Sequence, residues 1–144
     1  MIRKAIPGDA VILAKLSVEL WPHNDLQEMR SEFEKYLKNP ECALFLSFEE
    51  NEPIGFAQCQ LRYDYVEGTQ TSPVGYLEGI YVREEHRRHG IARQLLNACE
   101  SWAREVGCRE FASDCELTNT QSFAFHLRLG FAEANRIICF TKQL

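Results

Sequence analysis

A basic turn between a predicted strand and a predicted helix carries the clearest chemical signal in the sequence. It runs from Arg83 to Ala92 and reads REEHRRHGIA. The first amides of a helix have no partner inside the helix and lie at the positive end of its dipole, so they favour phosphate. Gly90 lets the backbone approach a ligand closely. We therefore expect a pyrophosphate here, the alternative being a solvated basic helix cap. The expected contact residues are Arg87, Arg88, His89, Gly90, Ile91 and Ala92.

The elements around this turn alternate between strands and helices. Apolar residues at helical spacing predict helices over residues 9–20, from near Asn24 to Asn39, over 91–106 and over 119–129. Strands are predicted over 2–6, 43–48, 54–62, 75–82 and 110–115, with a last strand or strand pair over 131–142. At least one strand–helix–strand crossover predicts an α/β fold with helices on both faces of a partly parallel sheet.

Length and composition restrict the class of protein. The 144 residues fit one domain that spans 1–144. The formal net charge of −5 argues against a general affinity for nucleic acid or for an anionic membrane. No apolar run is long enough to span a membrane, and no apolar core of a secretory signal follows the N-terminus. The six cysteines lack metal-binding spacing, so we expect no metal and six small buried side chains in a reducing cytoplasm.

Two motifs in the C-terminal half resemble those of the GCN5-related N-acetyltransferases. Residues 75–103, with Arg87-x-x-Gly90-x-Ala92, resemble the acetyl-CoA-binding motif, and residues 119–131 resemble the motif that follows it. The strings LWP at 20–22, RYDYV at 62–66 and LEGI at 77–80 resemble the aminoglycoside 6′-N-acetyltransferases within that superfamily. The resemblance implies the mixed central sheet of the GCN5-related acetyltransferase fold and acetyl-CoA as co-substrate.

The same resemblance implies where the cofactor arm would lie. The family places pantetheine beside the strand that ends in Ile80-Tyr81-Val82, and one of these amides would stabilise the oxyanion. Asn119 would cap its helix and also bind the pantetheine amide. His126 stands where the superfamily usually has a tyrosine. An imidazole there could protonate the leaving thiolate, bind the cofactor, or simply pack in the helix.

Acetyl transfer also requires a carboxylate that removes a proton from the acceptor amine. Glu78 and Asp114 lie at comparable points on two strands that the fold pairs, so both can project into one cleft. Asp114 is the first candidate base and Glu78 the second, although each could merely pair with an arginine. The resemblance assigns Trp21 and Tyr65 to the acceptor with these two carboxylates, and His23 is a further candidate there. Trp21 could instead be a core aromatic.

The sequence therefore predicts an enzyme that acetylates the 6′-amine of aminoglycosides and confers resistance. An acetyltransferase for polyamines or protein amines remains an alternative, as does a non-catalytic acyl-CoA sensor. Members of the family commonly dimerise through C-terminal strands, so we expect a cytoplasmic homodimer. The apolar run 137–140 suits that contact, and it equally suits an interior strand.

Overall fold

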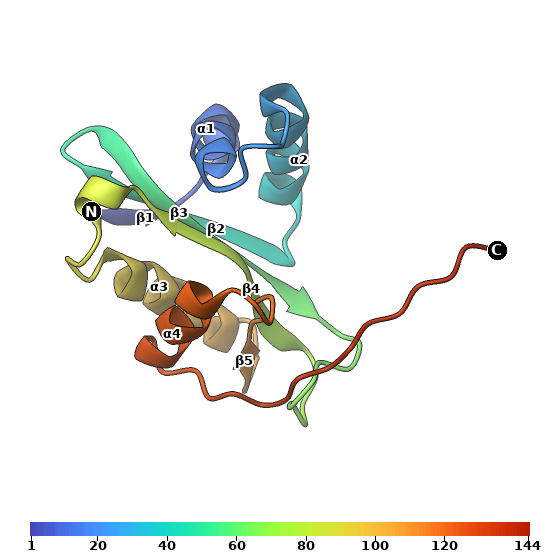
Figure 1. Cartoon of the computed structure of the whole chain (residues 1–144). Coiled ribbons are helices and arrows are strands. Elements are labelled where there is room, and N and C mark those ends of the chain that lie inside the picture. Colours follow the sequence, from blue (N-terminus) through green and yellow to red (C-terminus); the bar gives the residue numbers. More distant parts are fainter.

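The centre of the molecule is a five-stranded sheet, and the computed structural model describes all residues from 1 to 144 (Figure 1). The strands pair in chain order: β1 (Ile2–Lys4), β2 (Cys42–Glu49), β3 (Glu52–Arg62), β4 (Val74–Val82) and β5 (Phe111–Ala112). The first three pairs are antiparallel, and β4 and β5 are parallel. The predicted mixed sheet is thus confirmed.

Helices cover both faces of this sheet (Figure 1). One face carries α1 (Ala10–Leu20) and α2 (Leu26–Lys38), and the other carries α3 (Ile91–Glu105) and α4 (Thr120–Arg128). Two single 3-10 turns, η1 (Pro7–Asp9) and η2 (Glu84–His86), precede α1 and α3. These bounds agree with the predicted helices to within a few residues. None of the helices combines the length and the apolar character that a membrane crossing requires.

Two apolar clusters hold the helices against the sheet. The cluster under α3 contains Leu95, Leu96, Cys99 and Trp102, packed against β-strand residues that include Leu77. The cluster under α1 and α2 joins two helices to β2 and β3, and its largest members are Leu13, Leu16, Phe33, Leu46 and Phe56. Burying residues of this size stabilises the fold by roughly 1.5–3 kcal/mol for each side chain. The sheet is therefore a rigid base for the loops at its edges.

Three predictions of local structure are wrong. The strand predicted over 110–115 pairs with β4 only at Phe111 and Ala112, because the chain turns away from β4 after them. Residues 131–142 form no strand, and the chain after α4 runs along the body and then away from it without pairing to any strand of the sheet (Figure 1). The apolar run 137–140 is therefore not an interior strand, since Phe140 is 88% exposed. Finally, Cys115 and Cys139 are exposed, while the other four cysteines are buried.

Asp9 stands at the N-cap position of α1, but its side chain makes no capping hydrogen bond to that helix. Its buried carboxylate accepts hydrogen bonds from Arg3 at 2.7 and 2.9 Å and from the amide of Ile6 at 2.8 Å. The hydrogen bonds from Arg3 are the main reason that the pKa of Asp9 is lowered. The carboxylate therefore ties the short strand β1 to the start of α1.

Asp9→Asn should lower the free energy of unfolding at pH 7 by about 1–3 kcal/mol, because Arg3 and the amide of Ile6 lose a charged acceptor that is itself buried. The folded pKa of Asp9 lies below its unfolded value, so the stabilisation is fully present above the unfolded pKa and is lost as the pH falls through the folded pKa. Urea titrations at pH 7 and at about pH 2.5, below the ordinary aspartate pKa, measure this. The exposed Asp64→Asn is the control, and an equal loss at both pH values would contradict the assignment.

Candidate active site

The start of α3 is an uncapped helix end that faces solvent. Its N-cap is Gly90, whose φ of 77° is left-handed and which has no side chain to cap the first amides. The helices α2 and α4 differ, since Asp25 and Asn119 accept hydrogen bonds from the amides of Glu28 and Ser122. The first amides of α3 are thus available to an outside acceptor. This is the site at which the sequence predicts a pyrophosphate.

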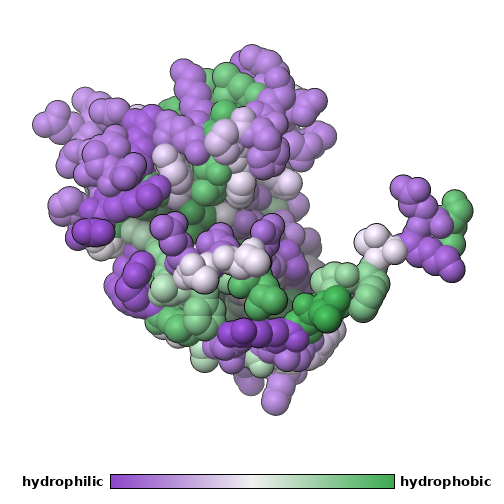
Figure 2. Space-filling model, in the orientation of Figure 1, coloured by the Kyte–Doolittle hydropathy of each residue, from purple (hydrophilic) through white to green (hydrophobic).

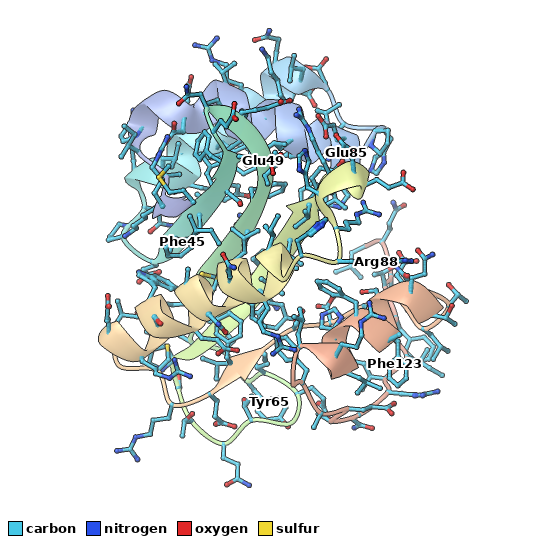
Figure 3. All side chains as sticks on the ribbon, turned by 90° about the vertical axis from the view of Figure 1, so that its left-hand side faces the viewer. Phe45, Glu49, Tyr65, Glu85, Arg88 and Phe123 are labelled. Atoms are coloured by element: carbon cyan, nitrogen blue, oxygen red, sulfur yellow. The ribbon has the colours of Figure 1, made fainter.

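The turn before α3 is strained and exposed at its tip. Arg88 has a φ of 66°, a left-handed conformation that few side chains adopt. Arg88, His89 and Gly90 are all exposed, and Figure 3 shows Arg88 on the turn that enters α3. His89 is held by a 3.3 Å contact between its Nδ1 and the carbonyl of His86. Such strain is typical of functional sites, where the surrounding structure maintains it.

Two arginines fasten this turn to the sheet. Arg87 donates from Nε to the carbonyl of Val82 at 2.7 Å, and Arg83 pairs with Glu19 at 2.9 Å and with Glu52 at 2.8 Å. Arg87 therefore shapes the anion site through the backbone as well as adding charge to it. The guanidinium of Arg83 is also the main reason that the pKa of Glu19 is lowered.

The end of β4 has one free edge. The last pair between β4 and β5 joins Tyr76 to Ala112, so the rest of β4, up to Val82, has only β3 beside it. The hydroxyl of Tyr81 points to the other helix layer and donates to Glu19 at 2.9 Å. Burial and this hydrogen bond raise the pKa of Tyr81 to about 12. The free edge includes the predicted contact residues Ile80, Tyr81 and Val82, whose backbone can serve a ligand there.

Glu78 lies in a β-bulge that the sequence did not predict. Gln58 pairs with Gly79 and Cys59 pairs with Leu77, so Glu78 has no partner across β3. A bulge disrupts the alternation of side chains and re-aims them, and bulges are common beside active sites. The bulge lets Leu77 and Ile80 both pack toward α3 although they are three positions apart in the sequence.

The two predicted carboxylates each bind a different neighbour. Arg62 donates to both oxygens of Glu78, at 2.9 and 3.1 Å, and its Cζ lies 3.4 Å from the ring centroid of Tyr76. The hydroxyl of Tyr76 donates to Oδ2 of Asp114. Glu78 thus pairs with an arginine, which was the alternative considered for it, whereas Asp114 does not. We did not predict Arg62 or Tyr76 as site residues, although Tyr76 precedes Glu78 by two positions.

His126 is fixed by hydrogen bonds at both ring nitrogens. Its Nδ1 lies 2.7 Å from the carbonyl of Ser122, and its Nε2 lies 2.8 Å from Oγ of Ser113. A carbonyl can only accept, so Nδ1 carries a proton and Nε2 faces the serine hydroxyl. The ring also packs against Phe131, with centroids 5.2 Å apart. Ser113 had no predicted role, although it directly precedes Asp114.

The predicted acceptor residues take three different positions. Trp21 ends α1 and lies on β4, so close that a Cβ added to Gly79 would be 2.8 Å from its ring. Its ring also packs edge-on against Phe56 at 6.3 Å, so it belongs to the core as well. His23 is exposed in the turn after α1, and Tyr65 is 75% exposed on the loop after β3 (Figure 3). The structure brings neither of these two into a hydrogen bond with the carboxylates.

The loop that carries Tyr65 is fastened at its far end. Glu110 accepts hydrogen bonds from the amides of Gln70 and Thr71 and from the hydroxyl of Thr71. These bonds, with the Thr71 hydroxyl first, lower the pKa of Glu110. The loop is therefore tied to the start of β5, next to the strand end that leads to Asp114.

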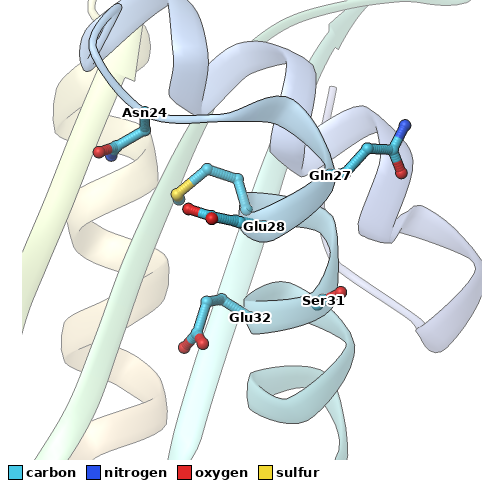
Figure 4. Close-up of a pocket in the computed structure, with 6 residues that line it drawn as sticks. Asn24, Gln27, Glu28, Ser31 and Glu32 are labelled. Carbon is cyan, nitrogen blue, oxygen red and sulfur yellow. The ribbon is translucent and has the colours of Figure 1, made fainter.

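A pocket of about 420 Å³ opens beside the turn between α1 and α2 (Figure 4). Its lining comes from the turn and from the first turns of α2, and consists of Asn24, Gln27, Glu28, Met29, Ser31 and Glu32. None of the sequence-predicted site residues lines it. The amide of Asn24 donates to the carbonyl of Trp21 at 3.0 Å, so the pocket adjoins the acceptor candidates and adds two carboxylates nearby.

Comparisons with known proteins point to one family. The sequence model described as "Acetyltransferase (GNAT) family" matches residues 11–131. An aminoglycoside N(6′)-acetyltransferase type 1 of Stenotrophomonas maltophilia is 42% identical over 144 residues, which cover 99% of this chain and 93% of that protein. The protein of the same name from Acinetobacter baumannii is 44% identical over 87% of this chain and 86% of its own length.

A solved structure agrees with this assignment. The structure of AAC(6′)-Iy in complex with the bisubstrate analog CoA-S-monomethyl-acetylneamine superposes with a TM-score of 0.95 at 36% identity, covering 100% of this chain and 98% of the other. Because the family model and these relatives extend over nearly all of the sequence, the chain belongs to the acetyltransferase (GNAT) family.

Proposed function

We propose that this protein transfers the acetyl group of acetyl-CoA to the 6′-amine of aminoglycoside antibiotics, and that it confers resistance on the cell that carries it. The observation that carries the proposal is that β4 links a site for an anion to a site for a cation. The uncapped start of α3 follows the C-terminal end of β4, whereas Glu78 lies within β4 and Asp114 is hydrogen-bonded to Tyr76 of the same strand. The name of the Stenotrophomonas relative and the CoA-linked analog bound by AAC(6′)-Iy support the same assignment.

The cofactor is anchored at its diphosphate by the start of α3. The amides of Ile91 and Ala92, the backbone at Gly90, and the side chains of Arg88 and His89 face this group. The pantetheine arm then follows the free edge of β4 from Val82 back to Ile80. Asn119 keeps its Nδ2 for the pantetheine amide, because its Oδ1 is used as the cap of α4.

The reaction joins a nitrogen to the thioester carbon and releases the thiolate. Asp114 accepts a proton from the acceptor ammonium, and the free amine attacks the carbonyl carbon to form the C–N bond. A backbone amide near Ile80 stabilises the oxyanion of the tetrahedral intermediate. The C–S bond then breaks, and the departing thiolate takes the Nε2 proton of His126 in its imidazolium form, which leaves a neutral imidazole with its proton on Nδ1. The contacts with Ser122 and Ser113 orient the ring for this step.

The residues proposed for the acceptor suit a sugar that carries several ammonium groups. Trp21 supplies a flat apolar wall beside Gly79, and Glu78 and Asp114 supply negative charge. Tyr65 and His23 contribute from the loop after β3 and the turn after α1, where both side chains are exposed. A polyamine would satisfy the charge but would make little use of the indole wall, so we favour an aminoglycoside.

The protein acts as a homodimer in the cytoplasm, where acetyl-CoA is available. Residues 132–144, here called the C-terminal tail, first run along the body and then extend away from it, and they expose apolar side chains (Figures 1 and 2). Ile138 is 81% exposed and Phe140 is 88% exposed, which is costly for an isolated chain. Asn135 binds Glu67 at 2.7 Å, so the tail starts beside the loop that carries Tyr65. A second copy that pairs with the tail would bury these side chains.

Thiol release after mixing the protein with acetyl-CoA and an acceptor tests the proposal. We expect release with kanamycin, and a sensitive host that carries the gene should survive higher drug concentrations than the same host without it. Release with spermidine or a peptide alone would assign the protein to polyamines or protein amines. The absence of thiol release with every amine tested would favour a cofactor sensor and contradict the proposal.

Gly79→Ala should weaken acceptor binding without affecting the cofactor. The added methyl group would lie 2.8 Å from Cη2 of Trp21, so the indole must move off β4. We expect the KM for kanamycin to rise roughly tenfold, since small misplacements of a positioning group are costly, and the Kd for coenzyme A to stay the same. Gly8→Ala is the control because its Cβ would meet nothing within 4 Å. An unchanged KM would remove Trp21 from the acceptor site.

A further inference from the structure

A continuous series of side-chain contacts joins the two acceptor carboxylates. The guanidinium of Arg62 binds both oxygens of Glu78 and lies flat on the ring of Tyr76, 3.4 Å from Cζ to the ring centroid. The hydroxyl at the far end of that ring donates to Asp114. Glu78 comes from the bulge of β4 and Asp114 from the segment after β5, so the series connects two separate parts of the backbone.

Asp114 needs such a support. It is exposed and lies beyond the end of β5, and the bond from Tyr76 is the hydrogen bond that its carboxylate makes within the protein. An aspartate side chain at such a place is free to occupy several rotamers. The hydroxyl of Tyr76 binds Oδ2, which leaves Oδ1 for an ammonium group of the substrate. One bond therefore both fixes the carboxylate and leaves its reactive oxygen open.

Tyr76 is well suited to hold Asp114. It is only 6% exposed, it lies on β4 between Gln60 of β3 and Ala112 of β5, and it packs with Val66 and Val74. Burial and the neighbouring carboxylate raise the pKa of Tyr76, so the phenol keeps its proton at neutral pH and acts as a donor. The guanidinium of Arg62 covers one face of the Tyr76 ring and restricts the rotation of this side chain.

We propose that Tyr76 is a positioning residue for the reaction: its hydroxyl holds Asp114 in the orientation that receives the substrate's proton, and Arg62 fixes the ring of Tyr76 while it holds Glu78. The inference rests on the proposed function, in which Asp114 takes the proton from the acceptor amine. It adds two residues, Tyr76 and Arg62, that affect the substrate only by holding the two carboxylates in place.

A double-mutant cycle tests this role. Tyr76→Phe keeps the ring and its contact with Arg62 and removes only the hydroxyl. We expect kcat for kanamycin to fall about tenfold, less than the loss that a 1 Å misplacement can cause, while the Kd for coenzyme A is unchanged. In an Asp114→Asn background the same substitution should change kcat less than about twofold, because no reactive carboxylate remains to be positioned. Tyr63→Phe, on an exposed ring, is the matched control.

Other outcomes overturn the proposal. An equal loss in both backgrounds would mean that Tyr76 acts on its own, and an unchanged kcat in the wild-type background would mean that it does not position Asp114. Arg62→Lys keeps the charge but cannot stack flat or bind both oxygens in the same way, so it should lower kcat in the wild type more than in Tyr76→Phe.

A crystal structure of Tyr76→Phe gives a readout that does not depend on activity. The side chain of Asp114 should leave its present position while the backbone at Ala112 stays in place. If the carboxylate does not move, the positioning role is refuted. Failure of the proposed function gives a different result, since the wild-type protein would then release no thiol with any aminoglycoside, whatever the position of Asp114.

Discussion

Asp114→Asn should lower kcat for an aminoglycoside by about 10²-fold or more, within the range that general-base catalysis contributes. Asparagine has nearly the same shape and still accepts the hydrogen bond from Tyr76, so the local structure is retained. It carries no charge and cannot take a proton from the acceptor ammonium. The side chain is exposed and its charge is not part of the core, so the melting temperature should stay close to that of the wild type. Steady-state thiol release measures kcat directly.

The Kd for coenzyme A provides the internal control for this variant, because Asp114 lies apart from the start of α3 and should not affect it. Glu105→Gln, which removes an exposed carboxylate at the end of α3, is the matched surface control. A loss smaller than about threefold in Asp114→Asn would move the base to Glu78 or to solvent, since it would fall far below a general-base contribution.

Gly90→Asp should raise the Kd for coenzyme A about 100-fold, equivalent to about 2.7 kcal/mol. Gly90 stands where the first amides of α3 are free, and a carboxylate there competes for these amides and repels the diphosphate. Aspartate tolerates the left-handed backbone better than most side chains, and a Cβ at this position meets nothing within 4 Å. The fold should therefore persist while the cofactor is lost. Isothermal titration calorimetry measures the change.

Gly107→Asp is the matched control for this experiment. Gly107 also has a positive φ, at 98°, and open space at its Cβ, but it lies after the opposite end of α3. Both variants impose a similar backbone strain, and only Gly90→Asp places the charge at the predicted anion site. If the two variants weaken coenzyme A binding equally, the diphosphate does not lie on the first turn of α3.

The elements that could be predicted from the sequence are those whose structure depends on residues close together in the chain. The Arg87-x-x-Gly90 spacing after a strand correctly indicated the start of a helix, while the pyrophosphate expected there stays a prediction, and Asn119 does cap α4. The helices were predictable for the same reason, since their apolar residues repeat at helical spacing. The bulge at Glu78 was not predictable in this way, because it depends on how β4 registers with β3.

Contacts between distant segments account for the errors in the site and at the C-terminus. The partners of Asp114 and Glu78 come from β3 and β4, and no spacing within one strand indicates that Arg62 would lie on Tyr76. The strand over 131–142 was expected from its apolar residues, but a strand also needs a partner, and in this structure the segment pairs with neither β5 nor any other strand. An apolar composition indicates that a segment is stable only when its side chains are buried, but it does not identify the surface that buries them.

A pair of aminoglycosides that differ only at C6′ gives the most direct test of the account. The wild-type protein is mixed with acetyl-CoA and with each compound, one bearing an amine at this position and one a hydroxyl, and the products are analysed by mass spectrometry and NMR. We expect one acetyl group on the 6′-nitrogen of the first compound and little turnover of the second. Equal turnover of the two compounds, or an acetyl group on another nitrogen, would contradict the account.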